Sequence, residues 1–109
     1  MGVDYRAVLG IGIILETVND VIEFLEENNL LSKEEREYVE ENYITEFSHD
    51  SKIEVVSLDA YSGDYFFVGY ELNPRDPELF ADEVKAAISN WKRYFPDEKP
   101  FMVHTVKVY

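Results

Sequence analysis

The order in which two hydrophobic periodicities alternate along the chain constrains its fold more than any other feature. Residues 5–16, 52–58, 64–72 and 101–109 are predicted strands, and the segments before the second and fourth of them repeat apolar residues at helical spacing. The first crossover contains a pair of helices. This order predicts an α+β fold with βαββαβ topology. We expect a ferredoxin-like sandwich, with an antiparallel four-stranded sheet, helices on one face, and the first and third strands central.

The predicted helices begin and end at residues suited to those positions. Thr17 can cap the first helix, and the Asn-Asn-Leu-Leu segment can end it because Asn tolerates the left-handed conformation. Ser32, with Glu35, has capping-box spacing, and Asp76 with Pro77 opens the last helix. The apolar stripes expected to face the core are Val18, Val21, Ile22 and Leu25, then Val39, Tyr43, Ile44 and Phe47, and finally Phe80, Val84, Ala87, Ile88 and Trp91.

Length and composition predict one domain over residues 1–109. The chain is 46% hydrophobic, with eight Tyr, seven Phe and one Trp, which is enough to form a core without disulfides or bound metal ions. It contains no cysteine, so disulfides, thiolate metal sites and a cysteine nucleophile are excluded. The apolar run at residues 7–15 is too short to span a bilayer and lacks the flanks of a signal peptide. We therefore expect a cytoplasmic protein.

Two glycines, Gly10 and Gly12, interrupt the first apolar run. They do not open a nucleotide-binding loop, because Leu15 occupies the place of the third glycine and the chain has no Gly-Lys-Ser/Thr. Within a strand they leave bare backbone on one face. Either a helix or an aromatic side chain from a neighbouring strand packs there, or the face is a flat patch for a ligand or partner.

Two aromatic residues of the third predicted strand, Tyr65 and Phe67, also share one face. Aromatic side chains on central strands stack bases in RNA-binding sheets, but the segment has no Lys or Arg. Core packing or a dimer contact fits it better. The candidate sheet-face contact residues are Gly10, Gly12, Tyr65 and Phe67.

Residues able to support catalysis or metal binding are scattered. His49 and His104 are the only histidines and have no ligand spacing, so we expect neither a metal nor a cofactor. Asp59 and Asp64 flank a turn and would either form an acid–base pair or act as turn residues. The chain has no nucleophile-elbow motif. We expect a protein that is not an enzyme.

The net charge is −13, and it is concentrated in one segment. Residues 16–47 contain 11 acidic and 2 basic residues, a net charge of −9. Such acidity argues against direct binding to nucleic acid or to anionic membranes. The predicted helix pair then has two interpretations: a solvated exterior, or a surface that imitates DNA phosphates and binds a basic protein. The candidate partner-binding residues are Asp20, Glu23, Glu26, Glu27, Glu34, Glu37 and Glu41.

The opening residues, MGVDYRAVLGIGI, resemble the start of small uncharacterised acidic proteins encoded by tailed bacteriophages. This resemblance covers about the first 13 residues and implies a phage accessory protein in the host-cell cytoplasm. It also implies a basic or nucleic-acid-binding host protein as partner. Two alternatives remain: a small-molecule-binding or minor enzymatic domain that uses the Gly10/Gly12 patch and the Asp59/Asp64 hairpin, and a self-assembling virion component. A homodimer is compatible with the sheet-face contact.

Overall fold

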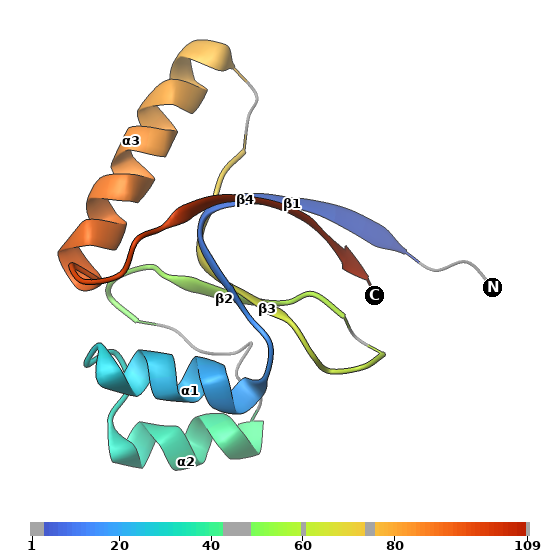
Figure 1. Ribbon diagram of the computed structural model, residues 1–109, viewed down its shortest axis with the longest axis vertical. Coiled ribbons are helices and arrows are strands. Elements are labelled where there is room, and N and C mark those ends of the chain that lie inside the picture. Colours follow the sequence, from blue (N-terminus) through green and yellow to red (C-terminus); the bar gives the residue numbers. More distant parts are fainter. Residues whose placement is uncertain (1–3, 43–48, 60, 74–75, 109) are drawn as a thin grey trace.

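The computed structural model describes residues 4–42, 49–59, 61–73 and 76–108, with only the helical backbone for residues 38–42. These residues form an α+β fold with a four-stranded antiparallel sheet in the order β2-β3-β1-β4 (Figure 1), so the α+β prediction is confirmed. The first and third strands are the central pair. The elements are β1 (Tyr5–Leu15), α1 (Val18–Glu27), α2 (Lys33–Asn42), β2 (Glu54–Ser57), β3 (Phe66–Glu71), α3 (Pro77–Tyr94) and β4 (Phe101–Val108).

Local capping interactions set the helix ends where the sequence predicts them. The Thr17 and Ser32 hydroxyls each accept a hydrogen bond from the backbone N–H three residues later, both at 3.1 Å. The Asp76 carboxylate accepts one from the N–H two residues later at 2.9 Å, and Pro77 is the first helical residue. Asn29, just after α1, has a φ of 60°. These contacts satisfy backbone groups that a helix end otherwise leaves without partners.

The main core lies between the sheet and the helices α1 and α3. Phe24 of α1 stacks against Phe95 with ring centroids 4.9 Å apart, and Trp91 of α3 lies 4.4 Å from Phe95. Ala87 and Trp91 of α3 belong to this cluster, and the other predicted core residues of α3 are partly buried and pack against it. The predicted core residues of α1 also belong to it, apart from Val18, which is 36% exposed. Helical side chains lean toward the N-terminus, so the side chain of this first residue projects beyond the start of α1. For α2, the predicted stripe lies outside the described side chains.

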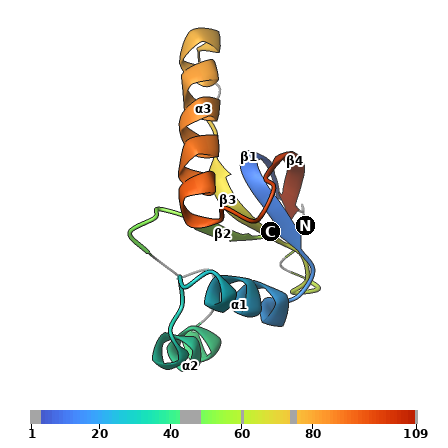
Figure 2. The same cartoon turned by 60° about the vertical axis from the view of Figure 1, so that its left-hand side comes forward.

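The sheet is strongly curled because the two neighbours of β1 pair with different halves of that strand. Its residues 5–12 pair with β4 and its residues 10–15 pair with β3, so only three positions, Gly10 to Gly12, pair on both sides. Figures 1 and 2 show the resulting bend, with the β1–β4 ribbon arching over the β2–β3 hairpin. The end of β4 reaches back to the residue after β2 through an isolated bridge between Val108 and Asp59. The curl gives the sheet a second, inward-facing surface.

A second apolar cluster fills the inside of this curl. It consists only of residues from the strands and the segments next to them, and its central members, Val8 and Phe67, are 0% exposed. No helix contributes to this cluster among the described residues. The curl itself therefore covers a sheet face that a flat sheet would leave in water. The members are Val8, Val56, Leu58, Phe67 and Val103.

Candidate functional site

The glycines of β1 lie at the bend and contact neighbouring strands. A Cβ atom on Gly10 would lie 2.4 Å from Cζ of Phe67, so the aromatic ring rests on bare backbone. Gly12 pairs across the ladder with Gly69, and a Cβ atom on Gly12 would lie 2.1 Å from the Val68 carbonyl oxygen. The contact at Gly10 matches the structural interpretation, in which an aromatic side chain packs on the glycine, whereas at Gly12 the backbone of β3 makes the close approach. Gly69 is a residue that sequence reasoning missed.

Of the four candidate sheet-face residues, only Tyr65 lies at the surface, where it is 50% exposed. Gly10, Gly12 and Phe67 are buried inside the curl. Tyr65 has a φ of 64°, and its N–H donates to the Glu16 carbonyl oxygen at 2.7 Å. Its side chain borders a shallow cavity of about 270 Å³ at the open end of the curl. The cavity is lined by Ile14, Leu58, Asp59, Tyr65, Thr105, Val106 and Val108.

The Asp59–Asp64 hairpin has the geometry of a turn. The Asp59 carboxylate accepts hydrogen bonds from the N–H groups of Tyr61 at 2.9 Å and Ser62 at 3.2 Å. These bonds, with Ser62 first, lower the pKa of Asp59 below its usual range. An acid–base pair would need one carboxyl group with a raised pKa. The contacts therefore favour the turn interpretation.

A charged cluster that sequence reasoning missed joins β1, β3 and β2. The Arg6 guanidinium donates to both carboxylate oxygens of Glu71, at 2.9 and 3.1 Å. Glu54 lies beside this pair, and burial together with the negative charge of Glu71 raises the pKa of Glu54. Next to the ion pair is a cavity of about 450 Å³, also lined by His104 and Asn73. Because Arg6 is already bound to a carboxylate, the cavity has no unpaired guanidinium for an anionic ligand.

Replacing Glu54 by Gln is expected to raise the free energy of unfolding at pH 7, because the neutral amide is neither repelled by Glu71 nor penalised for its partial desolvation. The gain should be only a few tenths of a kcal/mol, because much of the residue is in contact with solvent, which screens the charge. The folded state raises the pKa of Glu54, so its protonated form favours folding below the ordinary value of 4.5. That contribution is lost as the pH rises through the raised pKa. Urea unfolding at pH 7 and pH 3 should show the gain only at pH 7. The control Glu71→Gln breaks the ion pair with Arg6 and should lower stability at pH 7; a gain in both variants would contradict this account.

The acidic candidate residues of α1 divide into two groups. Asp20, Glu23 and Glu27 are exposed and follow the i, i+3, i+7 spacing of one helix stripe. Glu26 is half-buried, and its carboxylate binds the Arg36 guanidinium of α2 at 3.1 Å. Figure 2 shows α2 on the side of α1 away from the sheet, so this ion pair joins the two helices. Glu26 thus has a structural contact, whereas the other three carboxylates face water.

On α2, Glu34 and Glu37 are exposed, and the side chain of Glu41 lies outside the described part. We call Asp20, Glu23, Glu27, Glu34 and Glu37 the acidic helix surface. Within the described residues, none of these five carboxylates has an ion pair. Five of the seven candidate residues are therefore exposed, Glu26 is half-buried in an ion pair that the sequence did not indicate, and the side chain of Glu41 is not described.

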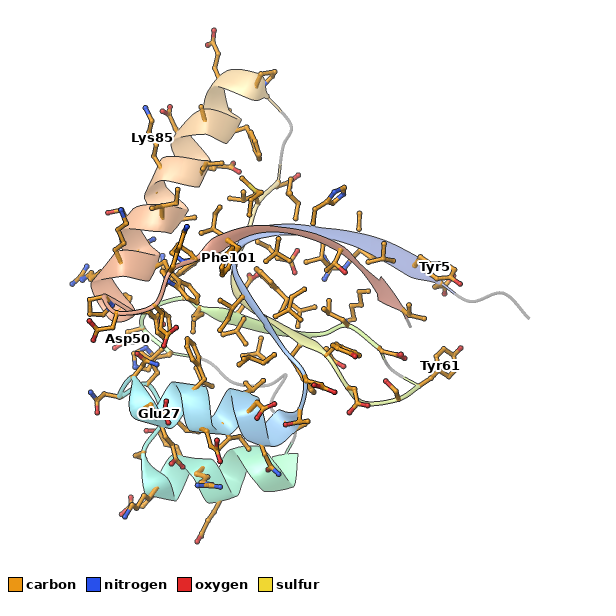
Figure 3. The ribbon with its side chains drawn as sticks, in the orientation of Figure 1. Tyr5, Glu27, Asp50, Tyr61, Lys85 and Phe101 are labelled. Atoms are coloured by element: carbon orange, nitrogen blue, oxygen red, sulfur yellow. The ribbon has the colours of Figure 1, made fainter. Side chains whose placement is uncertain are left out.

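Basic residues gather in a different part of the chain. Residues 84–109 contain Lys85, Lys92, Arg93, Lys99 and Lys107 against Asp97 and Glu98, a net charge of +3. The rest of the chain therefore carries −16. Figure 3 places Lys85 on the outer side of α3, away from α1 and α2 at the other end of the molecule. The charge is thus segregated along the sequence, with Lys85 as one basic residue far from the acidic helices.

The described residues contain no group of three or more His, Asp or Glu side chains that could hold a metal ion. Nδ1 of His49 accepts a hydrogen bond from the Ser51 N–H at 3.0 Å, and its ring meets Tyr94 edge-on. No helix in the same part of the chain is long and apolar enough to cross a membrane. Comparisons with protein-family models, curated proteins and solved structures found no match to this chain.

Proposed function

We propose that this chain is a non-enzymatic binding protein whose partner is a basic, nucleic-acid-binding protein. The contact is made by the acidic helix surface. The observation that carries the proposal is the division of α1 into two stripes: Val21, Ile22 and Leu25 are fully buried, and Asp20, Glu23 and Glu27 are exposed without ion pairs among the described residues. The buried stripe holds the helix in place and so fixes where the exposed carboxylates lie.

The repulsion between the exposed carboxylates of α1 is an argument that these charges serve a function. Carboxylates three or four residues apart on one helix repel each other at a cost of a few tenths of a kcal/mol per pair. Glu26 shows that a guanidinium on α2 can reach α1, yet Asp20, Glu23 and Glu27 have no such neighbour in the described structure. A row of negative charges on a rigid element attracts a basic protein surface and speeds its association. This is the arrangement that a mimic of DNA phosphates requires.

The proposal also covers the fold family, the biological setting and the alternative of a small-molecule role. The order β2-β3-β1-β4, with two helices packed against one side of β1 and β3, supports a ferredoxin-like assignment with a helix pair in the first crossover. The phage-like opening residues support an accessory protein that acts in the host cytoplasm. A small-molecule role at Gly10 and Gly12 is less well supported, because both glycines are buried and are covered by Phe67 and by the backbone of β3.

The test is affinity capture from a bacterial lysate with two matched triple variants. Asp20→Asn/Glu23→Gln/Glu27→Gln removes three charges from α1, and Glu78→Gln/Asp82→Asn/Asp97→Asn removes three exposed charges elsewhere. We expect wild type and the second variant to retain the same basic protein at low salt and the α1 variant to lose it. Each lost charge–charge contact is expected to weaken binding by roughly threefold to tenfold. Equal retention by all three proteins would contradict the proposal.

A further inference from the structure

The outer edge of β4 is the strongest candidate for a second interaction surface. β4 is an edge strand of the sheet, and Figure 2 shows it on the outside of β1 with no described helix beyond it. Phe101, Met102 and Val106 are 58%, 51% and 47% exposed. Natural sheets usually protect a long apolar edge with prolines, bulges or several charges. Between Phe101 and Val108 this strand has only Lys107.

The backbone hydrogen bonds show which groups of β4 are available. The N–H of Val108 donates to the Leu58 carbonyl oxygen at 2.8 Å, on the side away from β1. Because N–H groups alternate sides along a strand, those of Met102, His104 and Val106 also point away from β1. On β1 the Leu9 carbonyl oxygen accepts from Leu72 at 2.8 Å, which agrees with this alternation. Three consecutive even-numbered residues therefore present donors and acceptors to solvent.

From this edge we infer that two copies of the chain associate by antiparallel pairing of β4 with β4, which forms a continuous eight-stranded sheet. The inference concerns a different surface from the proposed function and goes beyond it. When two such edges pair, the residues whose N–H and C=O groups point outward must lie opposite each other, so even-numbered residues of one copy face even-numbered residues of the other. In the register centred on His104, Met102 of each copy lies opposite Val106 of the other. Apolar side chains that are half exposed in one copy then cover each other across the interface.

Charge permits a second copy at this edge, although it opposes self-association over the rest of the molecule. Two chains of net charge −13 repel each other over most of their surfaces. Residues 99–109 contain no acidic residue, so the β4 edge is a place where two copies can approach without opposing carboxylates on the paired strands. The interface is self-complementary, as two-fold symmetry requires. A single pair of edge strands buries less surface than a standard interface, so we expect a weak dimer with a Kd of roughly 10 to 1000 µM.

The test is sedimentation velocity over roughly a hundredfold range of protein concentration. Wild type should shift from monomer to dimer. Met102→Lys/Val106→Lys places cations opposite cations in the paired register and should raise Kd at least roughly tenfold. The matched control Val18→Lys/Leu79→Lys adds the same charges at exposed apolar sites on α1 and α3 and should dimerise like wild type. Circular dichroism confirms that each variant is folded.

Amide hydrogen exchange supplies an independent readout at the level of single residues. In the dimer, the N–H groups of Met102, His104 and Val106 should exchange more slowly at high than at low protein concentration. The N–H groups of Val103 and Thr105 face β1 and should be protected from exchange at both protein concentrations. The inference is overturned if wild type stays monomeric to roughly 1 mM. It is also overturned if a dimer forms and the β4 variant leaves its Kd unchanged, because the interface then lies elsewhere.

Discussion

Replacing Gly12 by Ala is expected to lower the free energy of unfolding by about 3 kcal/mol or more, enough to leave a typical domain of this size barely folded. The added Cβ would lie 2.1 Å from the Val68 carbonyl oxygen and 2.8 Å from Cα of Gly69. Both are backbone atoms, so no side-chain rotation can relieve the overlap. Relief requires β1 and β3 to separate at the bend, which would also expose the cluster inside the curl. Chemical denaturation followed by circular dichroism measures the loss.

Gly63→Ala is the control for this experiment. Gly63 has a φ of 71°, but a Cβ atom there would meet nothing within 4 Å. Its cost is only that of placing a side chain in the left-handed region, about 1 kcal/mol. If Gly12→Ala cost no more than Gly63→Ala, the close approach of β1 and β3 would not be what fixes the curl.

Trp91→Ala is expected to cost about 3–5 kcal/mol of unfolding free energy, because it removes the largest fully buried side chain of the main core. Trp91 contacts both aromatic neighbours from α1 and the end of α3, Phe24 and Phe95. Its Nε1 also donates to the Glu98 carbonyl oxygen at 2.8 Å. The substitution therefore leaves a cavity and removes a hydrogen bond at once.

The variant Trp91→Phe separates these two effects. It keeps most of the apolar contact but cannot donate to Glu98, so it should cost about 1–2 kcal/mol. Unfolding followed by circular dichroism is the suitable measurement, since Trp91 is the only tryptophan and fluorescence is lost in both variants. A loss below about 1 kcal/mol for Trp91→Ala would show that α3 is not anchored through this residue.

The parts of the structure that sequence reasoning predicted are the local ones. Thr17, Ser32 and Asp76 cap their helices through bonds that span two or three residues, so the pattern is contained in a short segment. The four strands followed from their periodicity, and the α+β class followed from the alternation of strands with helical segments. Val18 was misjudged because spacing alone does not show that a side chain at a helix start extends past its own helix.

The curl of the sheet could not be predicted because it depends on contacts between distant segments. Gly69 stands out in the sequence as a glycine inside an apolar strand, but only the register shows that it lies opposite Gly12. The same holds for the Arg6–Glu71 ion pair and for the bridge between Asp59 and Val108. On the acidic surface, composition identified α1 and α2 as exposed and charged, whereas the contact between Glu26 and Arg36 required their relative placement.

The curl and the acidic helix surface are linked through one element. α1 follows β1 directly, and its buried stripe packs in the main core with β1 and β3. Strand pairing at the bend therefore fixes the place of α1 and, with it, the positions of Asp20, Glu23 and Glu27. The proposed binding function needs this rigidity, because a partner gains most from charges that are already in position.

The most direct test of the central claim, that the acidic helix surface occupies the nucleic-acid site of a basic partner, is a competition experiment. The captured partner is bound to fluorescent duplex DNA and titrated with this protein, with the α1 triple variant and with the control triple variant. We expect wild type and the control to displace the DNA completely and the α1 variant to displace it at least roughly tenfold less well. Added salt should weaken all displacement. A stable ternary complex of partner, DNA and this protein would contradict the claim.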